Sequence, residues 1–331
     1  MYLSEAIDSF IGHSRARGLE PSTIDNLRQP LTRGLEAWGD LPMQDISSHH
    51  VDQLFAYNQY KPRTQNLYIG ALRQFFRWAN HTGIRVGDDP TFGWRARKVE
   101  REDRVRIPVE RFPDLLDAAG SARDRMVVAI GLYTFMRGSE IQLLRVNSVN
   151  FSGGVIHMRR QKTKEDDSMP ICLELREELV RWLAFYRQNC GNEDLRPTWF
   201  LTPSKGPNTY RKDRATGEYV QVPGERLRPW TQVSHPYEIA KKAMHSIGYP
   251  SVKNEGIHTL RRSGARALFD SLKAQGEDQA LLIVGSMLGH KDTKVTAHYI
   301  GLQVERERRN QRFTGERLFP DMPKTRGLKA I

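Results

Sequence analysis

Four stretches within the first 85 residues repeat apolar side chains at the spacing of an α-helix. Side chains three and four positions apart lie on one helical face, so each stretch predicts a helix with one apolar stripe. The four sets are Leu3, Ile7, Phe10 and Ile11; Ile24, Leu27, Leu31, Leu35 and Trp38; Val51, Leu54 and Phe55; and Leu67, Ala71, Leu72, Phe75, Phe76 and Ala79. Such stripes bury against one another, which predicts a small helical bundle. The aromatic residues fall at core spacing, which favours packing over base stacking.

Local signals predict where these helices begin and end. Pro30 lies inside the second stripe and predicts a kink or a split, because an interior proline removes a hydrogen bond and clashes with the preceding turn. Ser47 or Ser48 is expected to cap the third helix, and Thr64 the fourth. Gly83 is expected to end the fourth helix.

The helical period fades between Pro90 and Pro108, where basic residues crowd together. They are Arg95, Arg97, Lys98, Arg101, Arg104 and Arg106. A chain of 331 residues has the length of two ordinary domains, so we place the domain boundary in this segment. A linker this basic can follow a phosphate backbone, and a solvated hinge is the alternative interpretation.

The charge balance favours a polyanionic partner. Lys plus Arg number 51 and Asp plus Glu 39, which gives a net charge of +12 and a pI near 9.8. Nucleic acid is the natural partner of such a chain, and a basic protein without that ligand is the alternative. There is no run of about 18 apolar residues and no secretory leader pattern, so membrane and secreted classes are not expected. Cys172 and Cys190 have no companion zinc ligands, and a reducing, cytoplasmic compartment is expected.

The second half of the chain is predicted to be mostly helical around one hairpin. Helical apolar patterns are expected at 126–132, 175–186, 237–247 and 281–288. Gly289 is expected to end the last of them. Segments 155–159 and 169–173 predict two strands joined by a polar turn at 162–168, and 190–235 is expected to be mostly loop. The predicted fold class is therefore mainly α with a small β-hairpin.

Four side chains near the C-terminus can together hold and cut a phosphodiester. His258 and Arg261 are three residues apart, which places both on one helical face, and His290 and Tyr299 follow. A tyrosine hydroxyl has an unperturbed pKa of about 10, so it needs a base or cations to act as a nucleophile near neutral pH. Arginine stays charged and grips phosphate oxygens, while histidine can donate or accept a proton.

Two residues far upstream complete a characteristic order. Arg137 stands where a helix is expected to break, with Glu140 close enough in sequence to hold its neighbourhood by hydrogen bonding, and Lys162 stands in the hairpin turn. In this order the chain resembles the tyrosine recombinase (phage integrase) family over nearly its whole length. The residues that carry the resemblance are Arg137, Lys162, His258, Arg261, His290 and Tyr299.

The resemblance implies a two-domain tyrosine recombinase architecture. A helical core-binding (SAM-like) DNA-binding domain is expected at 1–90 and a basic linker at 91–108. A mixed α/β catalytic domain is expected at 109–300, followed by a tail at 301–331. The charged segment 302–313 predicts a helix that docks on a neighbouring protomer or, alternatively, a solvated end. The chain begins directly with the core-binding pattern, so we expect a compact integrase without an arm-binding domain.

The same resemblance implies the chemistry. Tyr299 would attack the scissile phosphate, leaving a 3′-phosphotyrosyl link and a free 5′-hydroxyl. Arg137 and Arg261 would bind the non-bridging oxygens, a task that other phosphoryl-transfer enzymes give partly to Mg²⁺. Lys162 would protonate the leaving 5′-oxygen. No metal, ATP or other cofactor is expected.

The two histidines take supporting roles in the resemblance: His258 would assist proton transfer, and His290 would hydrogen-bond the phosphate. The chain departs from the family pattern in one place, because Thr134-Phe135-Met136 stands where the family commonly has Thr-Gly-Leu. Lys164 competes with Lys162 for the hairpin role. We favour Lys162, since Lys-Thr followed by a polar turn is the commoner pattern.

Four further basic residues are expected to contact DNA. Arg63 and Arg73 belong to the fourth helix and its start, and Arg97 and Lys98 belong to the linker. A solvated polar face is the alternative for the helical pair.

The predicted function is that of a site-specific DNA integrase of a phage or other mobile element, working in the cytoplasm and nucleoid of a bacterial host. The partners implied are double-stranded DNA attachment sites, further copies of the chain in a tetramer on two duplexes joined through a Holliday junction, and accessory DNA-bending or directionality factors. No membrane partner is expected. The alternatives are a Xer-type resolvase, a type IB topoisomerase and a non-catalytic DNA-binding regulator.

Overall fold

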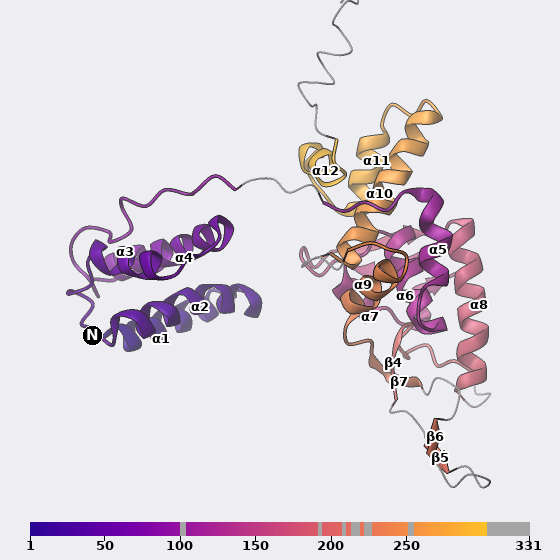
Figure 1. Cartoon of the computed structure of the whole chain (residues 1–331), viewed down its shortest axis with the longest axis horizontal. Coiled ribbons are helices and arrows are strands. Elements are labelled where there is room, and N and C mark those ends of the chain that lie inside the picture. The colour runs from indigo at the N-terminus through magenta and orange to yellow at the C-terminus, as the bar shows by residue number, and fades with distance from the viewer. Residues whose placement is uncertain are drawn as a thin grey trace, which may run out of the picture. The chain divides into compact units, whose positions relative to one another are not determined.

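The computed structural model describes residues 1–99, 104–190, 194–206, 210–212, 219–221, 227–250 and 255–302. The chain divides into two compact units, unit 1 (Met1–Asp103) and unit 2 (Arg104–Ile331) (Figure 1). The division falls within the basic segment 91–108 that the sequence suggests as a linker. From residue 303 onward, the charged tail that we expect to dock on a neighbour lies outside the described residues.

Four helices make up the described part of unit 1 (Figure 1). They are α1 (Leu3–Ala16), α2 (Pro21–Trp38), α3 (Ser48–Tyr57) and α4 (Pro62–His81). Their apolar stripes meet in one core, in which Phe10 packs edge-on against Phe75 with ring centroids 5.5 Å apart. Leu67 is an exception among the predicted stripe residues, because 47% of it is exposed. Gly83 takes a φ of +72° just after α4, as expected of the residue that ends a helix.

Two boundary predictions for unit 1 are wrong. Of the two outcomes predicted at Pro30, the split is wrong, because α2 runs on to Trp38. The proline itself is buried, and apolar packing of this face of α2 offsets the hydrogen bond that proline cannot make. Thr64 does not cap α4, because the helix begins earlier, at Pro62, whose fixed φ suits the first helical turn.

Unit 2 is mostly helical, and its described residues include three small antiparallel sheets (Figure 1). Its elements are η1 (Val109–Arg111), α5 (Phe112–Asp117), α6 (Ala122–Tyr133), α7 (Gly138–Leu143), η2 (Val146–Ser148), β1 (Val149–Asn150), β2 (Val155–Arg159), β3 (Asp166–Pro170), α8 (Leu173–Asn189), β4 (Pro203–Lys205), β5 (Tyr210–Lys212), β6 (Tyr219–Gln221), β7 (Leu227–Gln232), α9 (Pro236–Ser246), α10 (Ile257–Ala274), α11 (Ala280–Leu288) and α12 (Thr293–Tyr299). The largest sheet has the order β1-β2-β3. The predicted fold class, mainly α with a small hairpin, is confirmed. No helix within the described ranges is long and apolar enough to cross a membrane.

One strand of unit 2 is shifted from its predicted place, and short strands form in a segment for which none was named. β3 begins at Asp166 and not at residue 169, so the turn after β2 is shorter than expected. The extra residues are polar and extend the ladder at an exposed edge, where hydrogen bonding and not apolar alternation defines the strand. Within the segment 190–235, which is expected to be mostly loop, β4 pairs with β7 and β5 with β6.

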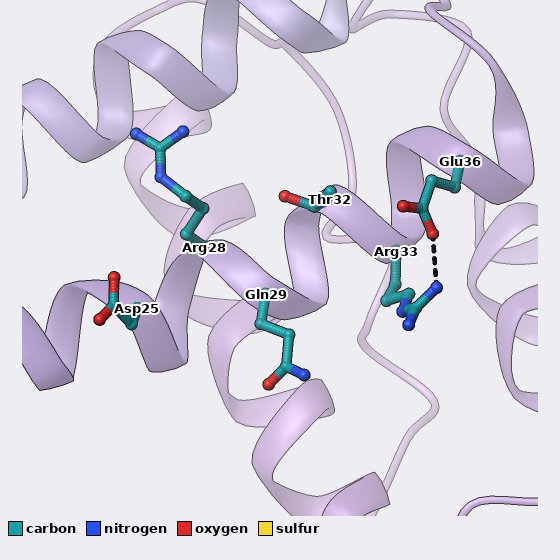
Figure 2. Close-up of a pocket in the computed structure, with 6 residues that line it drawn as sticks. All are labelled: Asp25, Arg28, Gln29, Thr32, Arg33 and Glu36. Carbon is teal, nitrogen blue, oxygen red and sulfur yellow. Dashed lines mark hydrogen bonds and ion pairs between the residues drawn. The ribbon is translucent and has the colours of Figure 1, made fainter. Parts of the chain in front are cut away.

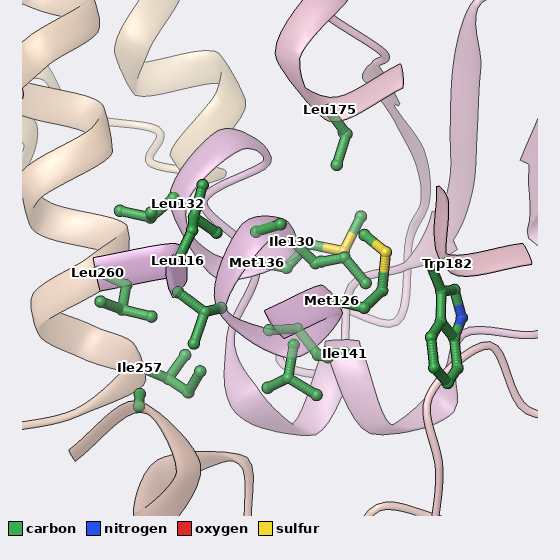
Figure 3. Packing of buried hydrophobic residues seen from close by; sticks show 14 of the residues in the cluster. Leu116, Met126, Ile130, Leu132, Met136, Ile141, Leu175, Trp182, Ile257 and Leu260 are labelled. Atoms are coloured by element: carbon green, nitrogen blue, oxygen red, sulfur yellow. The ribbon is translucent and has the colours of Figure 1, made fainter. Parts of the chain in front are cut away.

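The core of unit 2 surrounds α6, a helix that is apolar on almost every side. Figure 3 shows Leu132 of α6 beside Leu260 of α10, with Trp182 of α8 on the other side of the cluster. Gly264 lets α10 approach α6 closely, since a Cβ atom at this position would clash with the carbonyl oxygen of Leu132. This packing fixes the position of α10, the helix that carries Arg261.

Candidate active site

Arg137 lies at the junction of α6 and α7, where Glu140 in the first turn of α7 holds it by hydrogen bonds. It occupies the N-cap position of α7, where its backbone nitrogen donates to Glu140 Oε2 at 2.7 Å and its Nη1 donates to Oε1 at 3.0 Å. Just before it, Phe135 has a φ of +55°, in the left-handed region that favours glycine. The backbone here therefore has the conformation that suits the glycine of the family pattern. Burial of the Phe135 side chain offsets the strain of that conformation.

Arg261 is the most enclosed of the candidate residues, with 1% of it exposed. Its two terminal nitrogens donate to the carbonyl oxygens of Phe135 and Leu288, so it bridges the α6–α7 junction and the end of α11. Glu140 Oε2 lies 3.9 Å from Arg261 Nη1 and is its nearest carboxylate contact. Burial lowers the pKa of Arg261 to about 10, which still leaves the guanidinium charged at neutral pH.

His290 follows the left-handed Gly289 that ends α11, as the sequence predicts. Its Nδ1 lies 3.2 Å from the hydroxyl oxygen of Thr296 in α12. Burial, reinforced by the charge of Arg261 and other cations, lowers the pKa of His290 to about 4. The ring is therefore neutral at pH 7 and can donate one hydrogen bond while accepting another.

Tyr299 is the last residue of α12, and its ring lies among the other candidates. The ring centroid is 5.4 Å from that of His290 and 5.9 Å from Cζ of Arg261. Its hydroxyl donates to the backbone carbonyl of His258 at 3.2 Å. Burial raises the pKa of the hydroxyl and the charge of Arg261 opposes that rise, so the group needs activation to act as a nucleophile. Ile300, the next residue, is fully buried and anchors this end of α12.

His258 lies on α10 one turn before Arg261, and its side chain is exposed. Burial of part of the imidazole and the charge of Arg261 lower its pKa. The structure thus brings five of the six predicted site residues together from four segments. They are Arg137, His258, Arg261, His290 and Tyr299.

Lys162 lies in the exposed turn between β2 and β3. The turn is closed by two backbone hydrogen bonds: Arg160 donates to the carbonyl of Glu165 at 2.8 Å, and Lys164 donates to that of Arg160 at 2.8 Å. Glu165 Oε1, at the end of the turn, lies 3.9 Å from Nζ of Lys291, the residue after His290, so the turn lies next to this edge of the site. Lys164 is also exposed and has a φ of +60°. Both lysines therefore stay candidates for the role of proton donor.

The residues expected to contact DNA differ in their surroundings within unit 1. Arg63 and Lys98 are exposed. Arg97 donates from Nη1 to Gln65 at 2.9 Å, and its backbone pairs with the side chain of Asn66. Arg73 donates from Nη2 to the carbonyl of Trp94 at 2.6 Å, so its guanidinium also holds the segment after α4 against the bundle. DNA contact stays a prediction for all four.

A shallow surface pocket on unit 1 is lined by none of these four residues. Figure 2 shows its lining along α2, with Arg33 paired to Glu36. Arg28 and Asp25 add one further charge of each sign, so the pocket has no net charge to attract a phosphate. Within the described ranges, no three His, Cys, Asp or Glu side chains gather closely enough to hold a metal ion.

Two contributors to the site were missed in the sequence. Arg160 is 4% exposed and contacts both Asp167 and Glu140. It sits in a polar run at the end of β2, where nothing in the pattern separates a buried arginine from an exposed one. Thr296 is fully buried beside His290, and only the helical spacing of α12 could have indicated it.

His290 predicts a specific response of stability to acid. Its pKa is about 4 in the folded chain against an ordinary value of 6.5, so the unfolded chain takes up the proton first as pH falls. The stabilisation is complete above pH 6.5 and is lost as pH falls towards 4. We expect His290→Asn to lose less thermal stability than the wild type between pH 7 and pH 4.5, measured by melting temperature. Melting temperatures that fall equally with pH in the two proteins would contradict the lowered pKa of His290.

Comparison with known proteins identifies relatives along most of the chain. The model of the phage integrase family matches residues 106–306, which is more than half of the chain. The tyrosine recombinase XerC of Proteus mirabilis is 26% identical over 314 residues, and the match covers 92% of this chain and 91% of that protein.

Solved structures with a similar fold include two of lambda integrase. A dimer bound to a COC′ core site matches with a TM-score of 0.66 at 16% identity, covering 91% of this chain and 77% of that one. A tetramer bound to a Holliday junction matches with a TM-score of 0.63 at 17% identity, covering 88% and 78%. At these identities the likeness concerns the fold alone.

Proposed function

Because the chain belongs to the phage integrase family of tyrosine recombinases, which are DNA strand-transfer enzymes, we propose that it is the site-specific integrase of a phage or another mobile element. The observation that supports a catalytic chain best is the setting of Tyr299. Its ring lies beside Arg261 and His290, and its hydroxyl reaches the backbone of His258. A non-catalytic DNA-binding regulator has no need of a tyrosine enclosed by cations.

The proposed reaction forms one bond and breaks one. The Tyr299 oxygen attacks the scissile phosphorus, the bond to the 5′-oxygen breaks, and the DNA is left as a 3′-phosphotyrosyl ester. The tyrosine proton passes towards His258, whose lowered pKa keeps the imidazole able to accept it at neutral pH. Arg137 and Arg261 stabilise the charge on the non-bridging oxygens. Attack by a 5′-hydroxyl reverses the step and rejoins the strand.

Glu140 makes this arginine pair rigid. Its carboxylate is buried and lies 3.0 Å from Arg137 Nη1 and 3.9 Å from Arg261 Nη1. Two guanidinium groups held by one carboxylate stay in place before the phosphate arrives, and preorganised charge of this kind costs no rearrangement in the transition state. Neutral His290, beside them, can donate a hydrogen bond to the same phosphate.

We propose duplex attachment sites and further copies of this chain as the partners. Lambda integrase, with the same fold, has been solved as a dimer on a core site and as a tetramer on a Holliday junction. The net charge of +12 supports a DNA partner. Accessory bending or directionality factors stay part of the proposal.

A Xer-type resolvase is the second candidate, because the relative from Proteus mirabilis is a Xer protein. Candidate duplexes can be tested for strand exchange with purified protein. The integrase proposal expects joining of two different attachment sites, whereas a resolvase exchanges strands between copies of one site. Relaxation of supercoils without any joined product would favour a type IB topoisomerase and contradict both.

Lys162→Ala is expected to slow single-turnover cleavage by roughly 10²- to 10⁴-fold, because the leaving 5′-oxygen loses its proton donor. A bridging 5′-phosphorothiolate substrate should restore most of the rate, since a thiolate leaves without protonation. Lys164→Ala is the matched control on the same turn and should cleave at nearly the wild-type rate. If only Lys164→Ala shows the defect and its rescue, the assignment passes to Lys164.

A further inference from the structure

Arg160 is a buried guanidinium beside the site that the proposed mechanism does not use. It directly follows β2, at the base of the turn that carries Lys162. Only 4% of the residue is exposed. A charge this enclosed persists only where partners hold it, so its contacts identify what it connects.

Those contacts reach three separate segments. Nε donates to Asp167 Oδ2 on β3 at 2.7 Å, and Nη2 donates to the carbonyl oxygen of Met287 in α11 at 2.7 Å. Nη1 lies 3.7 Å from Oε2 of Glu140, the carboxylate shared with the catalytic arginines. The side chain therefore connects the hairpin, the end of α11 and the start of α7.

The contact with α11 is close to His290. Gly289 lies over the guanidinium, and a Cβ atom at this glycine would be 3.3 Å from Arg160 Nε. Gly289 also has a φ of +65°, which ends α11. Both this backbone conformation and the nearby guanidinium of Arg160 therefore favour glycine at this position. Arg160 thus sets the spacing between the base of the lysine turn and the residue just before His290.

The other described contacts of the turn are local or exposed. Lys162, Thr163 and Lys164 are exposed. The backbone bonds that close the turn join Arg160 to Glu165 and Lys164 to Arg160, and Arg159 Nε donates to the carbonyl oxygen of Lys164 at 3.1 Å. The ion pair between Glu165 and Lys291, at 3.9 Å, links the turn to the segment after α11, but both side chains are exposed and such a pair holds a turn only weakly. A displacement of about 1 Å in a catalytic group is enough to cost roughly 10²-fold in rate.

We propose that Arg160 is a positioning residue that holds the lysine turn of β2 and β3 at a fixed distance from His290 and the scissile phosphate. This inference rests on the proposed function, because it acts through the lysine that protonates the leaving oxygen. Arg160 does not touch the DNA in this role. Its loss therefore weakens general-acid catalysis and leaves the attack by Tyr299 intact.

The test compares cleavage of a normal substrate with cleavage of the bridging 5′-phosphorothiolate. Arg160→Met should cut the normal substrate roughly 10- to 100-fold more slowly than the wild type and cut the phosphorothiolate within about threefold of the wild-type rate. On the normal substrate, the double variant Arg160→Met/Lys162→Ala should be no slower than Lys162→Ala alone. A purely structural role predicts equal defects on both substrates and additive effects in the double variant, and either result would overturn the proposal.

Asp167→Asn provides a second route if Arg160→Met does not fold. This variant keeps Arg160 but removes the charge that holds Nε, and Asp167 is partly exposed. A smaller defect with the same phosphorothiolate rescue is expected. Asp166→Asn, exposed on the same strand, is the matched control and should behave as the wild type. A defect in Asp167→Asn without rescue would contradict the proposal, whereas absence of a covalent adduct with the wild type on both substrates would instead contradict the proposed function.

Discussion

Tyr299→Phe is expected to abolish the covalent DNA adduct and to reduce recombination by at least ~10⁴-fold, while DNA binding and folding change little. The variant removes only the hydroxyl, so the ring keeps its packing against His290 and Arg261. The lost hydrogen bond to the His258 carbonyl is worth about 1 kcal/mol. The measurement is the SDS-stable adduct formed on nicked suicide DNA that carries the cognate site.

Tyr249→Phe is the matched control for this experiment. Tyr249 is a partly buried tyrosine of unit 2 that does not belong to the candidate site. It should form the adduct at the wild-type rate. An undiminished adduct with Tyr299→Phe would contradict the assignment of the nucleophile.

Arg261→Ala has the second largest expected effect, and it acts on both catalysis and stability. Cleavage should fall by roughly 10³-fold or more, because a preorganised cation is lost from the transition state. The variant also leaves the carbonyl oxygens of Phe135 and Leu288 without their donor inside the protein, at a cost of roughly 2–5 kcal/mol. Single-turnover cleavage and denaturant unfolding measure the two effects separately.

Arg137→Ala is the informative comparison. Its side chain is 25% exposed, and the backbone bond from residue 137 to Glu140 persists in the alanine variant. We therefore expect a similar loss of cleavage with a stability within about 1 kcal/mol of the wild type. Equal stability of the two variants, or cleavage retained by Arg261→Ala, would contradict the described geometry.

The parts of the fold that follow from local patterns were predictable from the sequence. The apolar stripes located the four helices of unit 1, and Gly83 and Gly289 ended their helices as expected. The split at Pro30 was predicted wrongly because the cost of an interior proline is local, whereas α2 is held by packing against α1, α3 and α4. β3 was placed too late because its first residues are polar.

The contacts within the candidate site could not be predicted from local sequence patterns either. A pattern of residue types identified six candidates, but their contacts join segments more than 100 residues apart, such as Phe135 and Arg261. The burial of Arg160 could not be predicted, because Arg159 beside it is exposed and the two have the same chemistry in the sequence. The left-handed backbone at Phe135 is different, because the glycine that the family commonly has at this position was a signal for it, and the structure shows that the phenylalanine keeps that conformation.

Mass spectrometry of the trapped adduct tests the central claim most directly. Suicide DNA carrying the cognate site is cleaved by the wild-type chain, the complex is digested, and the peptide joined to DNA is sequenced. We predict a peptide modified at Tyr299 through a 3′-phosphate, together with a free 5′-hydroxyl on the released strand. A linkage at another residue, a 5′-phosphate linkage, or no linkage at all would contradict the assignment of Tyr299 as the nucleophile of a tyrosine recombinase.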